Sequence, residues 1–364
     1  MLDVSIEHKV GDFDLSMNLQ VKTGITALFG RSGCGKTTFV DILAGLETPS
    51  HGHVRINGAV VFSSSENINL PPEKRRVGYV FQDSRLFPHM TVERNLTYGM
   101  SQGPTKTRRH NLEDIVELLA LAPLLDRRPT RLSGGEKQRV AIGRALLSSP
   151  DILLMDEPLA SLDSTHRAEI LPFIERLAAE VGIPIVYVSH ALDEVIRLAD
   201  TMVVMSGGKI AASGSVEEVM SRLDLRPLTG RYEAGAVISA TVDKHDELND
   251  LSELACAAGT FIVPRVSHAV GARIRLRVRA RDVSLATEKP KATSVLNVFE
   301  GTVREFEQDG IPSQADILVD IGVPLIARIT RRSIRELGLA PGMTVYVMVK
   351  AAAIDRQNTG VRGR

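Results

Sequence analysis

The chain contains the octapeptide Gly30-Arg31-Ser32-Gly33-Cys34-Gly35-Lys36-Thr37, which matches the pattern G-x-x-x-x-G-K-[ST] at every fixed position. The apolar run before it predicts a buried strand, and the residues after it predict a helix. A strand, a glycine-rich loop and a helix in this order are typical of a phosphate-binding loop, because glycines let backbone N–H groups turn inward and a helix N-terminus favours anions. We therefore expect Lys36 to reach the β- and γ-phosphates of a nucleotide and the Thr37 hydroxyl to hold Mg²⁺.

The composition excludes several classes of protein. At 364 residues, 43% of them apolar, the chain is long enough for about two or three domains. Lys plus Arg and Asp plus Glu both number 44 and Trp is absent, which argues against a nucleic-acid-binding protein. No apolar run approaches the roughly 18 residues of a membrane span, and the N-terminus lacks the apolar core of a signal peptide. With only Cys34 and Cys256 present, a disulfide is not expected, so we predict a soluble protein of the reducing cytosol.

Residues 2–21 predict an antiparallel β-hairpin. Apolar and polar residues alternate in two runs, and Gly11-Asp12 between these runs is typical of a turn. Such a hairpin can lie beside the phosphate loop. Phe13, near the turn, either stacks on an adenine or packs as a core residue of the strand face, and the sequence favours neither interpretation.

Three apolar runs typical of buried strands end in polar residues: Gln82, Asp156 with Glu157, and His190. Parallel α/β sheets bind their ligands at the carboxyl ends of strands. Asp156 is therefore expected to hold Mg²⁺, and Glu157 to orient or deprotonate the attacking water. Gln82 is a candidate for ligating Mg²⁺ or orienting that water. A single His at a strand end is more often a surface residue, but His190 is the third polar group in such a position.

Ser133-Gly134-Gly135 predicts a second phosphate-binding device, because these residues open a helix that runs to about Leu147. Helical periodicity between the two devices predicts a helical subdomain over about residues 85–150. One nucleotide does not need two such devices from one chain. The sequence therefore predicts a head-to-tail dimer, in which Ser133 of each chain closes on the nucleotide of the other. The alternative is that Ser133 is an ordinary helix N-cap.

Together these motifs resemble the ATP-binding cassette of ABC transporters over about residues 1–225. The resemblance implies an α/β P-loop NTPase with a helical subdomain, and a homodimer that sandwiches two ATP molecules with Mg²⁺. It implies that Glu157 is the general base, that His190 contacts the γ-phosphate and that Gln82 senses the metal and the membrane subunit. Ser133 would be donated in trans. The metal ligands would be Thr37, Gln82 and Asp156. The ATP contacts would be Phe13, Gly30, Arg31, Ser32, Gly33, Cys34, Gly35, Lys36, Thr37, Thr38, Ser133, Gly134, Gly135 and Asp163.

Beyond residue 225 the sequence changes in character. Residues 226–230 predict a linker, and accessory strands are expected up to residue 290. One of these strands, residues 272–279, alternates arginine with apolar residues, which favours a solvated arginine face over an anion-binding one. Residues 291–356 are similar to the small all-β, OB-like TOBE or molybdopterin-binding-like barrel found in molybdate importer ATPases. Leu296 and Ala351 depart from that pattern, in which Arg and Ser are frequent at these places.

The combined resemblance implies the ATPase subunit of a molybdate or tungstate importer, bound peripherally to the cytoplasmic face of the cell membrane. The implied partners are integral membrane permease subunits, a periplasmic or extracellular oxyanion-binding protein and regulatory molybdate at the C-terminal barrel, with no nucleic acid. Importers of sulfate, phosphate, sugar or iron are the near alternatives. Non-transport ABC ATPases are less favoured, because the segment between the two phosphate devices lacks the sustained heptads of the DNA-repair members.

Overall fold

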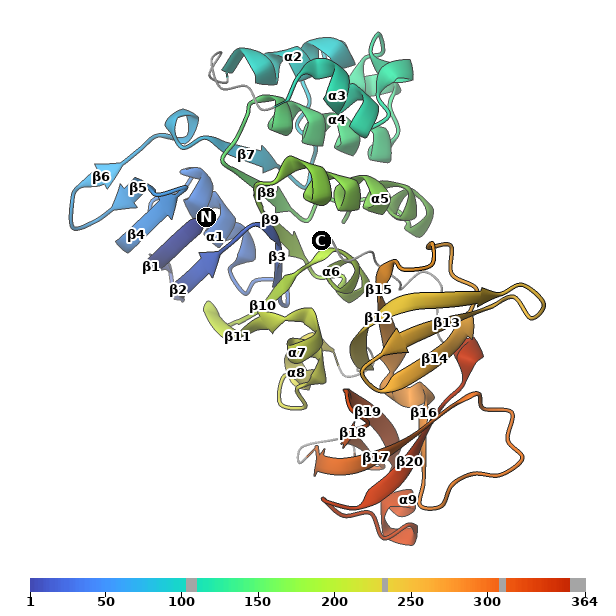
Figure 1. Cartoon of the computed structure of the whole chain (residues 1–364). Coiled ribbons are helices and arrows are strands. Elements are labelled where there is room, and N and C mark those ends of the chain that lie inside the picture. Colours follow the sequence, from blue (N-terminus) through green and yellow to red (C-terminus); the bar gives the residue numbers. More distant parts are fainter. Residues whose placement is uncertain (103–109, 231–234, 308–311, 354–364) are drawn as a thin grey trace. The chain divides into compact units, whose positions relative to one another are not determined.

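The computed structural model describes residues 1–102, 110–230, 235–307 and 312–353 (Figure 1). The chain divides into two compact units, the first from Met1 to Ser213 and the second beginning at Gly214. The boundary therefore lies before residue 225, where the sequence predicted the nucleotide-binding domain to end. The predicted C-terminal limit at residue 356 lies outside the described residues.

The first unit is built on a mixed sheet with the strand order β6-β5-β4-β1-β2-β11-β10-β3-β9-β8-β7. The strands from β10 to β7 in this order pair in parallel, and so do β11 and β2, whereas β6, β5, β4, β1 and β2 pair antiparallel with their neighbours in that order. The described strands are β1 Leu2–Val10, β2 Phe13–Val21, β3 Gly24–Phe29, β4 His51–Ile56, β5 Ala59–Ser63, β6 Ile68–Asn69, β7 Val77–Val80, β8 Ile152–Asp156, β9 Pro184–Ser189, β10 Thr201–Ser206 and β11 Lys209–Ser215.

The N-terminal hairpin is present as predicted. β1 pairs with β2 from Leu2↔Val21 to Val10↔Phe13, which leaves Gly11 and Asp12 as the turn. Gly11 has a φ of 59°, a left-handed conformation that glycine adopts at little cost. Away from the turn, the apolar residues of both strands point into the core while the polar residues remain more exposed, as period-2 alternation requires; Val10 and Phe13 beside the turn are exposed and half-buried.

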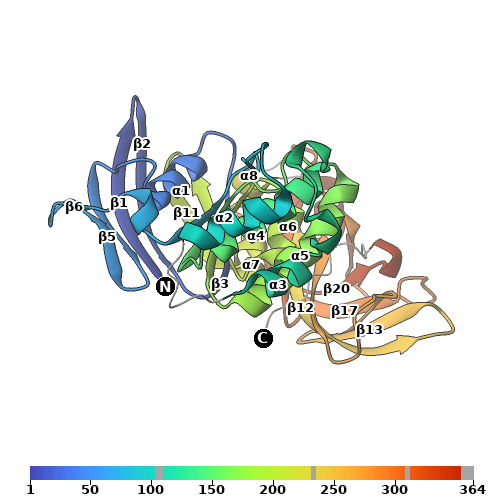
Figure 2. The same cartoon turned by 90° about the horizontal axis from the view of Figure 1, so that it is seen from above.

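The helical subdomain is also confirmed in the described residues. It contains α2 Val92–Gln102, α3 Leu112–Leu118 and α4 Gly134–Leu147, and α4 packs against α2, α3 and α5 Ser164–Val181. Figure 1 shows these helices grouped beside β7 and β8, and Figure 2 shows the group from above. The buried Asn95 on α2 fixes the preceding loop, because its amide accepts from the Phe87 N–H and donates to the carbonyls of Phe87 and Thr91. No helix in the described parts of the chain is long and apolar enough to cross a membrane.

The second unit combines two antiparallel sheets on one core. One sheet has the order β14-β13-β12-β15 and the other β16-β20-β17-β18-β19. Buried apolar residues of both sheets form a single cluster, in which the rings of Phe261 and Phe299 lie 4.4 Å apart. The accessory strands and the predicted barrel are therefore parts of one body. The strands are β12 Gly235–Asp246, β13 Leu251–Cys256, β14 Gly259–Pro264, β15 Arg273–Arg279, β16 Val283–Ala286, β17 Asn297–Phe306, β18 Gln314–Asp320, β19 Pro324–Thr330 and β20 Thr344–Val349, with helices α7 Val216–Ser221, α8 Arg226–Thr229 and α9 Arg331–Glu336.

The predicted linker at residues 226–230 is instead mostly helical. It forms α8, and Arg226 at its start is only 2% exposed. The Arg226 guanidinium pairs with Asp316 on β18, which Arg328 on β19 also contacts at 2.7 Å. A buried carboxylate requires such partners to offset its lost hydration. The composition of this segment is typical of a linker, but a distant aspartate holds it inside the second unit.

The prediction of a solvated arginine face on residues 272–279 was wrong. On β15, Arg275 and Arg277 are 3% and 2% exposed, and Arg273 alone of these three is exposed. Glu217 on α7 lies 3.0 Å from the Nε of Arg275 and also accepts a hydrogen bond from Ser239 on β12. Helix α7 therefore covers this face, which a period-2 pattern cannot reveal.

Candidate nucleotide site

Strand register brings the four predicted strand-end groups to one edge of the sheet. Val80 pairs with Met155, so Gln82 follows β7 beside the end of β8. Asp156 pairs with Val188, two residues before His190. Phe29 pairs with Ser189, so the phosphate loop begins beside the same end of β9. These are the carboxyl ends of parallel strands, where ligands of such sheets bind.

The phosphate loop joins β3 to α1 Lys36–Ala44. Gly35 caps the helix with a φ of 98°, and a Cβ at Gly30 would lie 2.5 Å from the carbonyl oxygen of Met205, so both positions require glycine. Lys36 is 5% exposed, and its ammonium donates to the carbonyls of Gly30 at 2.9 Å and Arg31 at 3.2 Å. The ammonium is thus held against carbonyl oxygens of the loop itself, which keeps the positive charge within the loop.

The remaining loop residues differ in exposure. Arg31, Ser32 and Thr37 are exposed, Thr38 is half-buried and Cys34 is buried. The Cys34 sulfur lies 4.0 Å from the Lys36 ammonium and 2.7 Å from the point that a Cβ of Gly30 would occupy. Cys34 therefore packs beneath the loop, while the exposed side chains line its outer surface.

Two of the three predicted magnesium ligands, Thr37 and Asp156, meet between α1 and β8. The Thr37 hydroxyl donates to Oδ1 of Asp156 at 3.4 Å. The described residues contain no cluster of three His, Cys, Asp or Glu side chains suited to a metal. Mg²⁺ needs no such cluster in a nucleotide site, because one or two carboxylates, substrate phosphates and waters complete its octahedral shell. The donors present are all oxygen atoms, so they fit Mg²⁺.

Asp156 is electrostatically unusual. Burial is the largest cause that raises the pKa of its carboxyl, and the nearby carboxylates of Glu157 and Asp41 raise it further. The hydroxyl of Thr37 and the ammonium of Lys36 act in the opposite direction. Because the folded pKa lies above the unfolded one, ionised Asp156 destabilises the fold at neutral pH, and a bound cation would relieve this cost.

We expect Asp156→Asn to raise the melting temperature of the nucleotide-free protein by about 2 °C or more at pH 7, because it removes a buried charge. The same variant should lose the Mg²⁺-dependent part of its affinity for a fluorescent ATP analogue. Asp163→Asn is the matched control, since hydrogen bonds from His166 lower the pKa of Asp163, and removing that stabilised charge should give no gain. A lower melting temperature for Asp156→Asn than for the native protein would contradict this account.

Glu157 occupies a left-handed backbone conformation with a φ of 45°, immediately after β8 ends. Its N–H donates to the carbonyl of Val188 at 3.1 Å, which holds the turn. Its Oε2 lies 3.1 Å from Nδ1 of His190, and the His190 side chain is 60% exposed. Strained backbone of this kind gathers at functional sites, where the surrounding structure imposes it. The arrangement turns the carboxylate toward His190 at the rim of the site.

Phe13 lies beside the phosphate loop. A Cβ added at Gly35 would come within 3.0 Å of its ring, and one at Gly208 within 3.1 Å. The ring is half-buried and packs against the main core cluster. The structure thus accommodates both interpretations of Phe13, and adenine stacking stays a prediction.

Ser133 is the N-cap of α4. Its hydroxyl accepts from the Glu136 N–H at 3.2 Å, and the Glu136 carboxylate accepts from the Ser133 N–H at 2.7 Å. Ser133 is therefore a helix cap, and it is also exposed at the helix N-terminus, where an anion is favoured. A Cβ at Gly134 would lie 2.7 Å from Leu162 and one at Gly135 3.3 Å from Ile170, so the two glycines let the helix start pack against α5 and the segment that leads into it.

A hollow of about 420 Å³ opens beside Ser133 between α4 and α5. Its lining includes Gly135, Arg139, His166 and Phe173. At its edge Asp163 caps α5, accepting from the Thr165 and His166 N–H groups at 3.0 Å. Of the predicted ATP-binding residues, Ser133 and Gly135 thus line this hollow, and Asp163 is linked to its lining through the hydrogen bond to His166.

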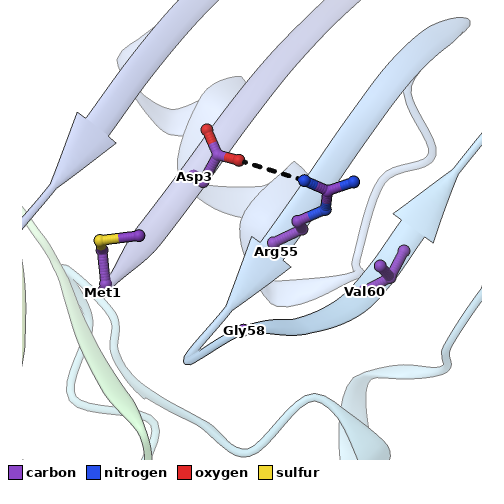
Figure 3. A pocket seen from close by; sticks show the side chains of 5 residues that line it. All are labelled: Met1, Asp3, Arg55, Gly58 and Val60. Carbon is purple, nitrogen blue, oxygen red and sulfur yellow. Dashed lines mark ion pairs between the residues drawn. The ribbon is translucent and has the colours of Figure 1, made fainter.

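Figure 3 shows another hollow, on β1, β4 and β5, where Arg55 points toward Asp3 at 3.8 Å beside Met1, Gly58 and Val60. None of the predicted site residues lines it.

Sequence reasoning missed a buried network behind His190. Glu194 on α6 Leu192–Leu198 accepts from Tyr187 and Ser189 at 2.8 Å, and Arg167 lies 3.3 Å from its other oxygen. Ser189 also accepts from the Ala191 N–H at 3.0 Å, which fixes the chain on both sides of His190. The only sequence signal was a Tyr and a Ser within an otherwise apolar strand.

Comparison with known proteins agrees with this architecture. Residues 14–160 match the ABC transporter family, and residues 293–355 match the TOBE domain family. The molybdenum import ATP-binding protein ModC of Paramagnetospirillum magneticum is 50% identical over 360 residues, covering 98% of each chain. The protein of that name from Mesorhizobium japonicum is 49% identical over 358 residues, covering 98% of this chain and 96% of the relative.

Among solved structures, cbiO1 from Clostridium perfringens, part of the ABC transporter complex cbiONQ, aligns with a TM-score of 0.53 at 27% identity. The alignment covers 62% of this chain and 92% of that one. Together, the site at the carboxyl ends of the parallel strands, the two family matches and the near full-length identity show that the chain belongs to the ABC transporter family, among its molybdenum import ATP-binding proteins.

Proposed function

We propose that this protein is the ATPase subunit of a molybdenum importer, which powers molybdate or tungstate uptake by binding and hydrolysing ATP. The near full-length identity of about half to molybdenum import ATP-binding proteins carries this proposal. The convergence of the phosphate loop, Asp156, Glu157 and His190 at one sheet edge supports the ATPase part.

Each residue of the site has a proposed role in phosphoryl transfer. The loop N–H groups and Lys36 hold the phosphates, while Thr37, Asp156 and Gln82 hold Mg²⁺, which when bound neutralises developing phosphate charge. Glu157 accepts a proton from the attacking water, and His190, 3.1 Å from that carboxylate, contacts the γ-phosphate and keeps Glu157 oriented. Phe13 stacks on the adenine ring.

The proposed active form is a homodimer in which Ser133 and its glycines close on the nucleotide of the other chain. Ser133 caps a helix of the α2–α4 group, whereas the phosphate loop opens α1 against the central sheet, and Figure 1 shows α4 and α1 apart. The exposed hydroxyl and helix dipole at Ser133 are therefore available to an incoming phosphate from outside its own site.

Integral membrane permease subunits are the proposed partners of the surface that follows Gln82. There Phe87 packs edge-on against Tyr98 of α2, with the ring centroids 4.7 Å apart, and Tyr98 remains 42% exposed. Arg85, two residues before Phe87 in the chain, is exposed. Aromatic and arginine side chains of this kind dominate protein interfaces. A peripheral position on the cytoplasmic face of the membrane follows from docking there, with an oxyanion-binding protein on the other side.

The transport proposal predicts ATP-driven uptake in vesicles that contain this chain and its permease, with ATP trapped inside and labelled molybdate plus the binding protein outside. Uptake should require trapped ATP and should be lost in Lys36→Ala, which removes the ammonium from the loop. Tungstate in excess should abolish the signal, whereas sulfate, phosphate, sugars or iron should not. Uptake of one of those solutes in place of molybdate would assign the chain to another importer class.

We also propose that the second unit binds molybdate as a regulator. Molybdate trapped together with ATP inside the same vesicles tests this, because a regulatory anion should slow uptake. The Asn297 amide is already engaged, since it accepts from the Ile262 N–H at 2.6 Å and donates to its carbonyl at 2.9 Å. Leu296 beside it is 51% exposed and offers no charge. A regulatory anion would therefore depend on backbone N–H groups.

A further inference from the structure

Helix α1 has a polar connection to the end of β7. Asp41 lies one helical turn after Thr37, so both side chains emerge on the same face of α1. Its Oδ1 accepts a hydrogen bond from the Tyr79 hydroxyl at 2.8 Å. Both residues are half-buried, so solvent weakens this charge-assisted bond only in part. A displacement of α1 by a bound nucleotide would therefore move the Tyr79 hydroxyl through this hydrogen bond.

Tyr79 in turn contacts the segment that contains Gln82. Its ring stacks on that of Phe81, with centroids 4.0 Å apart and planes inclined by 25°. The Arg85 guanidinium lies 4.0 Å from the centroid of the Phe81 ring. Stacked aromatic rings and an arginine over a ring face attract through the ring quadrupole. Residues 79, 81 and 85 thus form one continuous stack that flanks Gln82.

The helix that begins at Ser133 holds the other side of this segment. Arg144 on α4 donates to the carbonyls of Ser84 at 3.2 Å and Arg85 at 2.9 Å, and its guanidinium lies 5.1 Å from the centroid of the Phe87 ring. We call the segment from Phe81 to Phe87 the Gln82 segment. It is connected to α1 through Tyr79 and to α4 through Arg144.

We propose that Tyr79 is a coupling residue: its hydrogen bond to Asp41 and its stack on Phe81 transmit nucleotide-driven movement of α1 to the Gln82 segment. Tyr79 is thus a positioning residue that touches no substrate. The consequence for transport rests on the proposed function, because the Gln82 segment is the surface assigned there to the permease.

The Tyr79 hydroxyl remains a hydrogen-bond donor throughout the physiological pH range. Burial is the main cause that raises the pKa of Tyr79 far above its usual value, and the hydrogen bond to Asp41 raises it further. Asp41 needs only an acceptor oxygen at the same place to keep the bond. Asparagine supplies that oxygen and alanine does not, so the two substitutions separate loss of the bond from loss of the charge.

The test follows amide hydrogen exchange of the native homodimer with and without Mg²⁺ and a non-hydrolysable ATP analogue. In the native protein the analogue should slow exchange both in residues 36–44 and in the Gln82 segment. In Tyr79→Phe the response of residues 36–44 should persist, while that of the Gln82 segment falls about 3- to 10-fold, the range expected for losing a partly exposed bond to a carboxylate. An unchanged response of the Gln82 segment, or a parallel loss in both segments, would overturn the proposal.

Asp41→Ala should reproduce the effect of Tyr79→Phe, Asp41→Asn should restore the response, and the double variant Tyr79→Phe/Asp41→Ala should be no worse than either single change. Tyr346→Phe is the matched control, because its hydroxyl also faces a carboxylate, Glu300 at 3.4 Å, in the second unit. If the losses of the Gln82-segment response in the two single variants add up in the double variant, the two residues do not share one bond and the proposal is refuted. This comparison holds whether or not Tyr79→Phe alone is destabilised.

In vesicles with permease, Tyr79→Phe should lower molybdate transported per ATP hydrolysed about 3- to 10-fold, while permease-free hydrolysis stays within about twofold of native. The exchange assay uses neither permease nor molybdate. A different transported solute would therefore overturn the proposed function and leave the coupling intact, whereas a normal transport ratio in Tyr79→Phe would count against the coupling alone.

Discussion

Glu157→Gln is expected to slow ATP hydrolysis by about 10²-fold or more while leaving ATP binding intact. The amide retains the size of the side chain and can still face His190, 3.1 Å from the native carboxylate, but it cannot accept a proton from water. ATP then persists in the site, so the closed dimer should accumulate. Phosphate release measures the first effect, and gel filtration with Mg²⁺ and ATP measures the second.

Two variants make the Glu157 result specific. Glu157→Asp keeps a carboxylate base on a shorter side chain, so its rate of ATP hydrolysis should lie between those of Glu157→Gln and the native protein. Glu180→Gln changes an exposed carboxylate on α5 that pairs with Arg176 at 3.7 Å, and should hydrolyse ATP normally. Hydrolysis by Glu157→Gln near the native rate would exclude Glu157 as the general base and return that role to another group at the same edge.

Ser133→Arg is expected to disable the nucleotide held by the partner chain and not the one held by its own Lys36. In a purified mixed dimer of a Lys36→Ala chain and a Ser133→Arg chain, one composite site loses both elements and the other keeps both. A photoreactive ATP analogue should therefore label the Ser133→Arg chain, whose phosphate loop faces an intact Ser133. If each chain completed its own site, the two defects would fall on different sites and neither chain would label at native strength.

Substituting Ser133 also removes a helix cap, which costs about 1 kcal/mol of stability. Ser215→Arg is the matched control, because Ser215 caps α7 through the same reciprocal bonds with Glu218, at 3.2 Å and 2.9 Å. It should share the loss of stability and retain ATP hydrolysis. Equal loss of hydrolysis in both variants would indicate a capping role for Ser133 and no contact with phosphate.

Much of the site was predictable because its determinants are local. The phosphate loop requires glycines at positions such as Gly35, whose φ is 98°, and a helix directly after the loop, and both can be recognised within about 20 residues of sequence. The strand ends at Asp156 and His190 were recognisable as buried apolar runs followed by polar residues. The hairpin around Gly11 followed from period-2 alternation. In each case neighbouring residues impose the backbone conformation.

The coupling through Tyr79 was not predictable in this way. From the sequence alone, Tyr79 is one more aromatic residue of a predicted strand, and Asp41 is a polar residue on the outer face of a predicted helix. They are 38 residues apart in the chain and meet only because β7 pairs with β8 beneath α1. The αL turn at Glu157 likewise depends on the Val188 carbonyl of the neighbouring strand.

Local sequence was thus sufficient to recognise the hairpin, the phosphate loop and the polar residues at the strand ends, because periodicity and glycine placement act over short distances. It failed for the buried arginines 226, 275 and 277, since whether a charged side chain can leave water depends on a distant partner. For Arg226 that partner is Asp316, ninety residues away, and for Arg275 it is Glu217 on α7. The cost of desolvating a charge is met only by such partners, so tertiary packing alone decided that these faces are interior and that the expected linker belongs to the second unit.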